Sequence, residues 1–342
     1  MTSLKGRDYI ETQDLSLDEL QLLLDTSVEL KEKFHRGEPT LLLTNQTAFL
    51  LFFDKSTRTR NAFEAGMTQL GGHAHFLDST STQISHGETA ADTGKILAAM
   101  GHGICVRHDL ILGAGNRYMH EMADAANVPI INMQCDVDHP TQTLADLMTI
   151  REHFGPDFRG KIAVSWAYAP SYAKPLSVPQ GLITLMTRFG MDVVLAHPPG
   201  YDLVERTVEA AKTNAVASGG AFSIVDDMDA AFEGADIVYP KSWGVHDLML
   251  ARLDATSQAE IDENEQACLA MNHKHADWIC DERRMALAKD SAVYMHCLPA
   301  DRGSEVTDAV IDGPQSIVFQ EAENRLHTAK AIMACTMRER PF

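Results

Sequence analysis

The chain has 342 residues, 45% of them hydrophobic and 23% charged, which is typical of a globular protein of about two domains. The chain has 29 lysines and arginines and 48 aspartates and glutamates, which gives a formal net charge of −19 and disfavours a nucleic-acid partner. No apolar run approaches the length of about 18 residues that a membrane span requires, so no membrane partner is expected.

Short apolar runs alternate with longer segments of helical periodicity. In chain order, the first half predicts strands at 41–43 and 48–53, a helix at 56–71, a strand at 73–77, a helix at 87–100, a strand at 103–107, a helix at 119–126, a strand at 128–133 and a helix at 143–154. After a break at 155–157, the second half predicts a strand at 161–166, a helix at 181–189, a strand at 192–196, a helix at 203–218, strands at 237–239, 292–296 and 316–319, and a closing helix at 321–338. The alternation predicts an α/β fold of two halves, each a parallel sheet with helices on both faces.

The motif Ser56-Thr57-Arg58-Thr59-Arg60 follows a predicted strand and opens a predicted helix. The free N–H groups of a helix start, two guanidinium groups and three hydroxyls together suit a phosphate dianion. An ordinary helix cap with solvated arginines is the alternative. A P-loop is excluded because the GxxxxGK[ST] pattern is absent.

A second motif, His139-Pro140-Thr141-Gln142, follows the strand predicted at 128–133. Open α/β sheets bind ligands at the carboxyl ends of their strands, and His139 and Gln142 can both bond a carbonyl or an amide. A capped turn explains the same residues equally well.

Two more motifs lie in the second half. His296-Cys297-Leu298-Pro299 ends a predicted strand, where a thiol suggests a nucleophile, although a buried cysteine is more often inert packing. Arg325, in the segment ENRLH at 323–327, could bind an anion or pair with its acidic neighbours. The histidine pairs at 73/75 and 273/275 are better explained by a strand or a polar loop than by a metal site, because no further ligands follow at metal-site spacing.

In this order the four motifs closely resemble those of the aspartate/ornithine carbamoyltransferases, from about residue 40 to the end. The resemblance implies two doubly wound α/β domains with a cleft between them, assembled as a homotrimer without metal or organic cofactor. Residues 1–150 would bind carbamoyl phosphate, with a C-terminal helix at 321–342 packed back on them, and residues 151–320 would bind the second substrate. The lack of a signal peptide and of CxxC pairs favours a cytoplasmic enzyme with reduced thiols.

The resemblance also implies a role for each motif residue. Arg107, His139 and Cys297 would be catalytic. The residues expected at carbamoyl phosphate are Ser56, Thr57, Arg58, Thr59, Arg60, Arg107, His139, Gln142, Cys297, Leu298 and Arg325. Within this set, Thr59, Arg107 and His139 would surround the carbonyl oxygen. Gln142 and the Leu298 carbonyl would hold the carbamoyl NH₂, and Cys297 would orient the amine. A loop with Gln83, Ser85 and His86 would reach a neighbouring subunit's site.

The segment Lys241-Ser242-Trp243-Gly244 resembles the N-acetylornithine and N-succinylornithine branch, and the SMG motif of ornithine enzymes is absent. That branch carries a shallow knot, which is expected here only through the resemblance. Lys241, Trp243 and Arg302 are the candidates for the second-substrate site. Asp301 departs from the basic residue of acetylornithine enzymes, which disfavours acylornithine. Residues 165–181 and HCLPAD most resemble a knotted subgroup of unassigned specificity.

The expected partners are thus carbamoyl phosphate and a small amine, ornithine-like or related. The sequence leaves the amine open. It also leaves open the reverse reaction, phosphorolysis of a carbamoylated amine, and a homologue that binds carbamoyl phosphate without turning it over.

Overall fold

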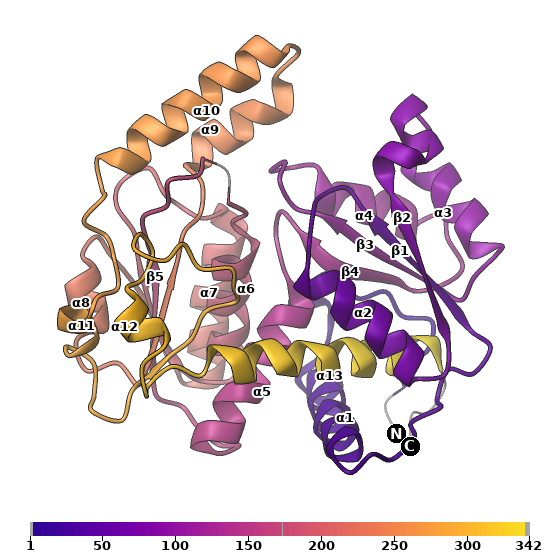
Figure 1. The fold of residues 1–342 in the computed structure, drawn as a ribbon, viewed down its shortest axis with the longest axis horizontal. Coiled ribbons are helices and arrows are strands. Elements are labelled where there is room, and N and C mark those ends of the chain that lie inside the picture. The colour runs from indigo at the N-terminus through magenta and orange to yellow at the C-terminus, as the bar shows by residue number, and fades with distance from the viewer. Residues whose placement is uncertain (1–2, 173, 339–342) are drawn as a thin grey trace. The chain divides into compact units, whose positions relative to one another are not determined.

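A computed structural model describes residues 3–172 and 174–338 of the chain. The chain forms two compact units (Figure 1). The first contains residues 1–109, Gly113–Thr149 and 322–342, and the second contains Leu110–Leu112 and Ile150–Glu321. Residues 339–342 of the C-terminal helix expected at 321–342 lie outside the described residues. Within the described part of the chain, no helix is long and apolar enough to cross a membrane.

The first unit is built on a four-stranded parallel sheet of order β2-β1-β3-β4. Its strands are β1 (Thr47–Phe52), β2 (His73–Asp78), β3 (Gly103–His108) and β4 (Ile130–Cys135). Every residue of β4 and all but the first of β1 are buried, as expected for a parallel sheet covered on both faces.

Helices of the first unit pack beside this sheet and against one another. They are α1 (Leu17–His35), α2 (Arg58–Gln69), α3 (Ala90–Ala98), α4 (Gly115–Ala123), most of α5 (Pro140–Phe154) and most of α13 (Val318–Met337). Gly66 of α2 lies against Lys330 and Met333 of α13. A Cβ on Gly94 of α3 would come within 2.8 Å of Met122 of α4, so α3 and α4 approach each other at a position where only glycine fits.

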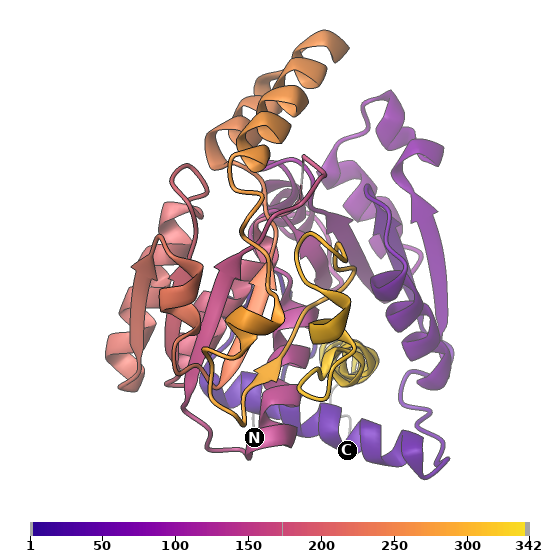
Figure 2. The ribbon, with the colours of Figure 1, turned by 60° about the vertical axis from the view of Figure 1, so that its left-hand side comes forward.

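The second unit contains a five-stranded parallel sheet of order β7-β6-β5-β8-β9. Its strands are β5 (Lys161–Trp166), β6 (Asp192–Ala196), β7 (Ala221–Val225), β8 (Ile237–Lys241) and β9 (Val293–Tyr294). Its helices are α6 (Ser177–Arg188), α7 (Glu205–Ser218), α8 (Met228–Phe232), α9 (His246–Ala251), α10 (Gln258–His273), α11 (Glu282–Met285) and α12 (Asp308–Ile311). Figure 1 shows α6 and α7 on one side of the sheet and α8 and α11 on the other, while α9 and α10 project beyond it (Figures 1 and 2). Short 3₁₀ helices occur at Thr12–Asp14, Ser79–Ser81, Gln83–His86 and Arg252–Asp254.

The predicted fold class of two parallel-sheet α/β domains is confirmed. Three strand predictions need correction. Residues 41–43 form no strand, since Leu42 and Leu43 lie in a turn, and the strand predicted at 292–296 is reduced to Val293–Tyr294. The strand predicted at 316–319 is wrong, because Ser316 makes only an isolated bridge to Tyr294 and α13 begins at Val318. A short apolar run cannot by itself distinguish a strand from the buried first turn of a helix.

Candidate active site

The carboxyl ends of β1, β3 and β4 bring the candidate residues of the first unit to one edge of its sheet. Arg107 pairs with Phe52 of β1 on one side and with Gln134 of β4 on the other. The β3–β4 register shifts between Val106 and Arg107, at the level of the candidate site. The Ser56–Arg60 motif follows β1 and His139 follows β4, so parallel topology places both at this edge.

The Ser56–Arg60 motif forms the start of α2, as predicted, with Arg58 as its first helical residue. Ser56 Oγ accepts the Thr59 backbone N–H at 3.3 Å. A pocket of ≈ 510 Å³ is lined by Ser56, Thr57 and Arg60, together with Lys55 and Thr80. The Arg60 guanidinium stacks 3.6 Å above the Phe76 ring and bonds Glu64 at 3.0 Å. Arg60 therefore already has partners on its own helix and on β2.

Thr59 is the point where two cationic side chains meet. Its side chain is buried, and its Oγ1 accepts a hydrogen bond from Arg325 Nη2 and a longer one, 3.4 Å, from Arg107 Nη1. Arg325 comes from α13 and Arg107 from β3, so three segments distant in sequence converge here. Two guanidinium groups beside a helix start form an environment that favours an anion.

His139 adds a neutral imidazole to this group. Arg325 Nη2 lies 3.2 Å from His139 Nε2, and Thr141 Oγ1 lies 3.3 Å from Nδ1. Because a guanidinium only donates, Nε2 accepts in this arrangement and the proton sits on Nδ1. Burial lowers the pKa of His139 well below its usual value, and the positive charges of Arg325, Arg107 and Arg58 lower it further. His139 is therefore uncharged near pH 7.

Buried polar residues that the sequence analysis did not single out hold these side chains in place. Arg107 donates to Gln134 Oε1 at 2.6 Å and to Asp109 Oδ2 at 2.8 Å. Burial raises the pKa of Asp109 to about 7, with Arg107 opposing the rise and Asp54 adding to it. Gln142 donates to Asp146 at 2.7 Å. The Arg-x-Asp spacing at 107–109 was visible in the sequence, but only the sheet register places Gln134 beside it.

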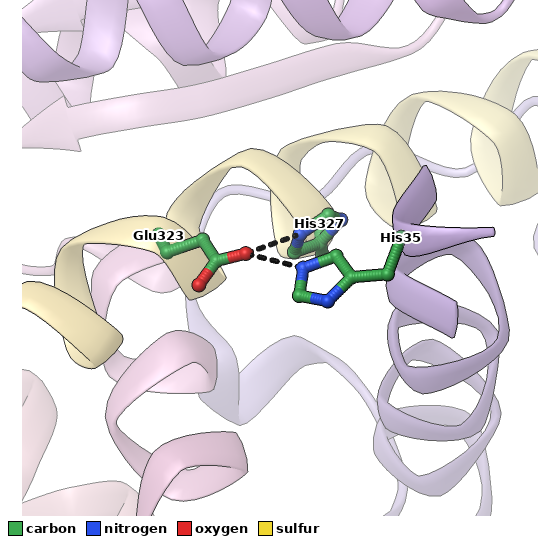
Figure 3. Close-up of side chains that lie close together, drawn as sticks. All are labelled: His35, Glu323 and His327. Atoms are coloured by element: carbon green, nitrogen blue, oxygen red, sulfur yellow. Dashed lines mark hydrogen bonds and ion pairs between the residues drawn. The ribbon is translucent and has the colours of Figure 1, made fainter. Parts of the chain in front are cut away.

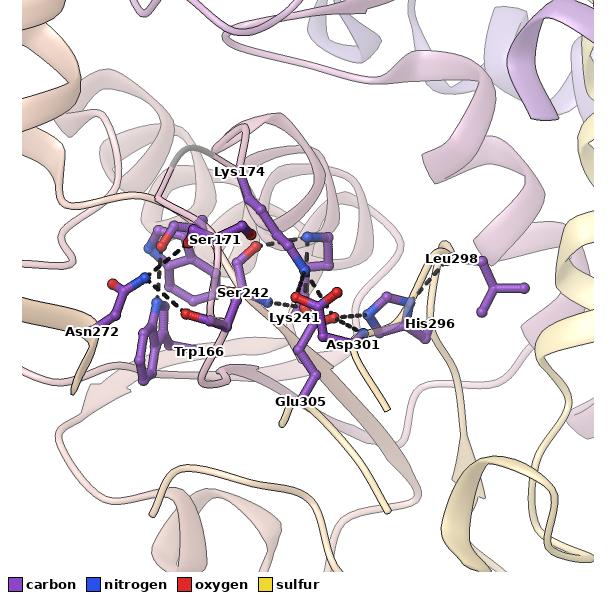
Figure 4. A network of polar contacts seen from close by, with 12 residues as sticks. Trp166, Ser171, Lys174, Lys241, Ser242, Asn272, His296, Leu298, Asp301 and Glu305 are labelled. Carbon is purple, nitrogen blue, oxygen red and sulfur yellow. Dashed lines mark hydrogen bonds and ion pairs between the residues drawn. The ribbon is translucent and has the colours of Figure 1, made fainter. Parts of the chain in front are cut away.

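The HCLP residues follow β9 in the second unit, and Figure 4 shows His296 and Leu298 of this segment. The His296 backbone N–H donates to Glu321 at 2.9 Å, and His296 Nδ1 accepts the Leu298 N–H at 2.8 Å. Leu298 has φ 53° and precedes a cis peptide bond to Pro299. Cys297 is buried, with 7% of its surface exposed. Burial lowers the pKa of His296, an effect that Glu305 opposes and that Lys241 and Lys174 strengthen.

A cluster of titratable side chains surrounds Glu305, a buried carboxylate that the sequence analysis missed. This Glu305 cluster consists of Lys174, Lys241, His296, Asp301 and Glu305 (Figure 4). Glu305 accepts the backbone N–H groups of Ser242 and Asp301, each at 2.7 Å. Burial alone would raise the pKa of Glu305, but Lys241, His296 and Lys174 outweigh it and hold that pKa well below its usual value.

The two lysines of the Glu305 cluster differ in their surroundings. Lys174 Nζ lies 2.7 Å from Asp301 and 3.1 Å from Glu305. Burial would lower the pKa of Lys174, but Glu305 and Asp301 raise it overall. Lys241 Nζ donates to the Ser242 carbonyl at 2.7 Å and lies 3.8 Å from Glu305. Burial lowers the pKa of Lys241, and Lys174 adds to this effect while Glu305 opposes it.

The remaining candidates for the second substrate lie apart from the Glu305 charges or have other partners. Trp243 is 1% exposed, donates to the Tyr201 carbonyl and packs as part of the core. Arg302 is exposed, and its guanidinium bonds Asp308 and Asp312 at 2.6 Å each.

Gln83, Ser85 and His86, the residues predicted to reach a neighbouring subunit, lie on the 3₁₀ helix Gln83–His86 of the first unit.

Comparisons with known proteins place the chain in a family. The family model described as "Aspartate/ornithine carbamoyltransferase, carbamoyl-P binding domain" matches residues 7–152, and the model described as "Aspartate/ornithine carbamoyltransferase, Asp/Orn binding domain" matches residues 176–336. The chain therefore belongs to the aspartate/ornithine carbamoyltransferase family.

Individual relatives agree with this assignment. The chain is 42% identical to "Putative carbamoyltransferase YgeW" of Escherichia coli strain K12, over 99% of this chain and 91% of that protein. It is 37% identical to an ornithine carbamoyltransferase of Anoxybacillus flavithermus, over 96% of each chain. A structure of acetylornithine transcarbamylase complexed with acetylcitrulline matches with a TM-score of 0.84 at 35% identity, over 96% of this chain and 98% of that one.

Proposed function

We propose that this carbamoyltransferase moves the carbamoyl group of carbamoyl phosphate to the amine of a small, ornithine-like substrate and releases phosphate. The observation that carries the proposal is the meeting of Arg107, Arg325 and His139 around the buried side chain of Thr59. We assign carbamoyl-phosphate binding to residues 1–150, with Arg325 of α13 contributing, and binding of the amine to residues 151–320. The match of residues 7–152 to the carbamoyl-P binding domain model supports the first assignment.

The phosphate would bind at the start of α2. Ser56, Thr57, Arg58, Thr59 and Arg60 offer hydroxyls, guanidinium groups and free helix N–H groups, which together match a dianion. Arg325 adds a further charge from α13. Arg60 would have to exchange its contact with Glu64 for the ligand, which reduces its expected net contribution to binding.

The carbonyl oxygen would lie among Thr59, Arg107 and His139, where preorganised donors stabilise the charge that develops on it. His139 Nε2 accepts from Arg325 in the ligand-free arrangement. To donate to the substrate oxygen it must take the other tautomer, which the displacement of Arg325 toward the phosphate would permit. The Gln142 side chain and the Leu298 carbonyl would hold the carbamoyl NH₂.

In the reaction an uncharged amine attacks the carbonyl carbon and forms a C–N bond. The C–O bond to phosphate breaks, its electrons leave with the phosphate, and the amine loses a proton. Cys297 would orient the amine or favour its uncharged form. Covalent catalysis is not required, because the mixed anhydride is already activated.

The second substrate would be read by Lys241, Trp243 and Arg302. The Glu305 cluster supports Lys241 most strongly, since it is a buried cation beside the HCLP residues. Trp243 would shape the core beneath the site through its contact with Tyr201. The Asp301 carboxylate is matched by Lys174, so its effect on an anionic substrate is weaker than an unpaired charge would exert.

We further propose a cytoplasmic homotrimer in which the loop with Gln83, Ser85 and His86 completes a neighbouring subunit's site. The loop is polar and exposed, as a segment that docks onto a neighbouring subunit's site would be. Light scattering with an activity assay tests this, and a monomer with full activity would refute it. The shallow knot stays a prediction from the resemblance.

An amine panel tests the function directly. Purified protein is mixed with carbamoyl phosphate and with ornithine, N-acetylornithine, N-succinylornithine or other diamines, and both phosphate and carbamoylated product are measured. Arg58→Ala serves as the inactive variant and Arg117→Ala, an exposed arginine on α4, as the control. Phosphorolysis of the product with phosphate tests the reverse direction. Binding of carbamoyl phosphate without turnover of any amine would instead indicate a non-catalytic homologue.

A further inference from the structure

His35, Glu323 and His327 form a compact cluster in the first unit (Figure 3). One potential ligand atom from each residue lies within 4.8 Å of the others. Glu323 Oε1 lies 2.6 Å from His35 Nε2 and 3.8 Å from His327 Nε2. We propose that this cluster binds a divalent transition-metal ion of the zinc class, a site that goes beyond the proposed carbamoyl transfer.

Secondary structure presents the three side chains to one another. Glu323 and His327 are four residues apart in α13 and therefore lie on the same helix face. His35 is the last residue of α1, where the aligned peptide dipoles leave a partial negative charge that favours a cation. Two imidazoles and one carboxylate are a ligand set that zinc accepts, with water in the fourth position.

His327 supplies an independent indication that the cluster lacks a component. Its side chain is fully buried, yet neither ring nitrogen makes a hydrogen bond among the described residues. Buried polar atoms are nearly always satisfied, so an orphaned imidazole that faces a carboxylate calls for a partner. A metal ion bound to Nε2 would provide one.

Charge around the cluster sets the expected affinity. Two lysines, Lys31 and Lys330, act electrostatically on His327. The same lysines repel a cation, although Lys31 bonds Asn324 and Lys330 bonds Gln69. We therefore expect micromolar rather than nanomolar binding.

Zinc–ligand distances of about 2.0–2.2 Å require the ligand atoms to stand further apart than the present 2.6 Å between Glu323 and His35. His35 can make this adjustment because its side chain is 53% exposed. The bound ion would link the end of α1 to α13. It would thereby stabilise the first unit in proportion to the metal concentration.

The test is a titration of the full, chelator-treated chain with Zn²⁺, followed by calorimetry and thermal unfolding. Wild type should bind one equivalent and gain thermal stability. His35→Gln and Glu323→Gln should each weaken binding at least ~10-fold and remove the gain. His246→Gln is the control, because His246 makes a similar contact with a carboxylate, 3.0 Å to Asp247, outside the cluster. Buried His327 is left intact so that a loss of metal binding is not confounded with a loss of packing.

X-ray absorption of the zinc-loaded protein separates this site from a thiolate site. Nitrogen and oxygen ligands alone support the proposal. Sulfur in the coordination shell, equal affinity in wild type and His35→Gln, or no binding to wild type would each overturn it. None of these outcomes bears on carbamoyl transfer, which the amine panel tests separately.

Discussion

Replacing Thr59 by valine isolates the hydroxyl on which Arg107 and Arg325 converge. Valine keeps the shape of threonine but cannot accept either guanidinium. A hydrogen bond to a charged group is worth ~1.5–3 kcal/mol, and the 3.4 Å contact with Arg107 counts for little because Arg107 keeps Gln134 and Asp109. Thr59→Val should therefore lower the free energy of unfolding by ~1.5–3 kcal/mol, mainly through Arg325.

The effect on turnover should exceed the effect on stability. If the Thr59 hydroxyl helps to stabilise the developing oxyanion, its loss should reduce kcat by ~10²–10³, as the loss of one preorganised donor does. The assay is steady-state kinetics at saturating amine, with kcat and the KM for carbamoyl phosphate measured separately. Urea denaturation supplies the unfolding free energy.

Two matched variants complete this experiment. Thr59→Ser keeps the hydroxyl and should retain most of the activity. Thr187→Val removes a buried hydroxyl of the second unit whose bonds within the described residues go to carbonyls of its own helix, and it should alter stability alone. If Thr59→Val keeps kcat within about threefold of wild type, the hydroxyl is structural and the carbonyl-oxygen assignment is wrong.

Three further predictions address the other parts of the molecule. Arg58→Ala should reduce turnover by ~10²–10³ and weaken carbamoyl-phosphate binding, and a variant close to wild type in phosphate-release assays would count against the phosphate site. Lys241→Met and Arg302→Met should raise the KM for the amine far more than the KM for carbamoyl phosphate, and unchanged amine KM values would remove both residues from the second-substrate site. The folded-state pKa of His327, about 3, lies below its unfolded value, so the unfolded chain binds an extra proton as the pH falls. The free energy of unfolding should therefore decrease by up to ~1.4 kcal/mol per pH unit below pH 6.5. Urea titrations in chelator from pH 6.5 to 4.5 should therefore show a shallower slope for His327→Gln, and identical slopes would refute this account.

The alternation of apolar runs was sufficient to predict two parallel sheets, because strands buried on both faces carry few polar residues. The apolar pattern did not predict α1 or α10. Both helices nevertheless begin with a capping box, formed by Ser16 with Glu19 and by Ser257 with Glu260. The apolar pattern also missed β7, an edge strand whose exposed positions interrupt the apolar run.

The sequence predicted those candidate site residues that come directly after a strand. The Ser56–Arg60 motif and His139 were found in this way, and they lie at the expected edge of the first sheet. Glu305 and Lys174 were not found, because an acidic residue and a lysine separated by 131 positions reveal a buried pair only after the chain has folded. The same limit affected Asp301, whose partner Lys174 alters the charge that the sequence suggested.

The Glu305 cluster constrains how substrate preference could be re-engineered. Exchanging Asp301 for lysine, to imitate the basic residue of acetylornithine enzymes, would leave Glu305 as the single carboxylate of the cluster facing three ammonium groups. Glu305 also fixes the backbone at Ser242 and at Asp301, so its displacement would disturb both segments. A variant designed to accept acetylornithine would therefore have to replace Lys174 together with Asp301. The single variant Asp301→Lys and the double variant should differ in stability as well as in substrate preference.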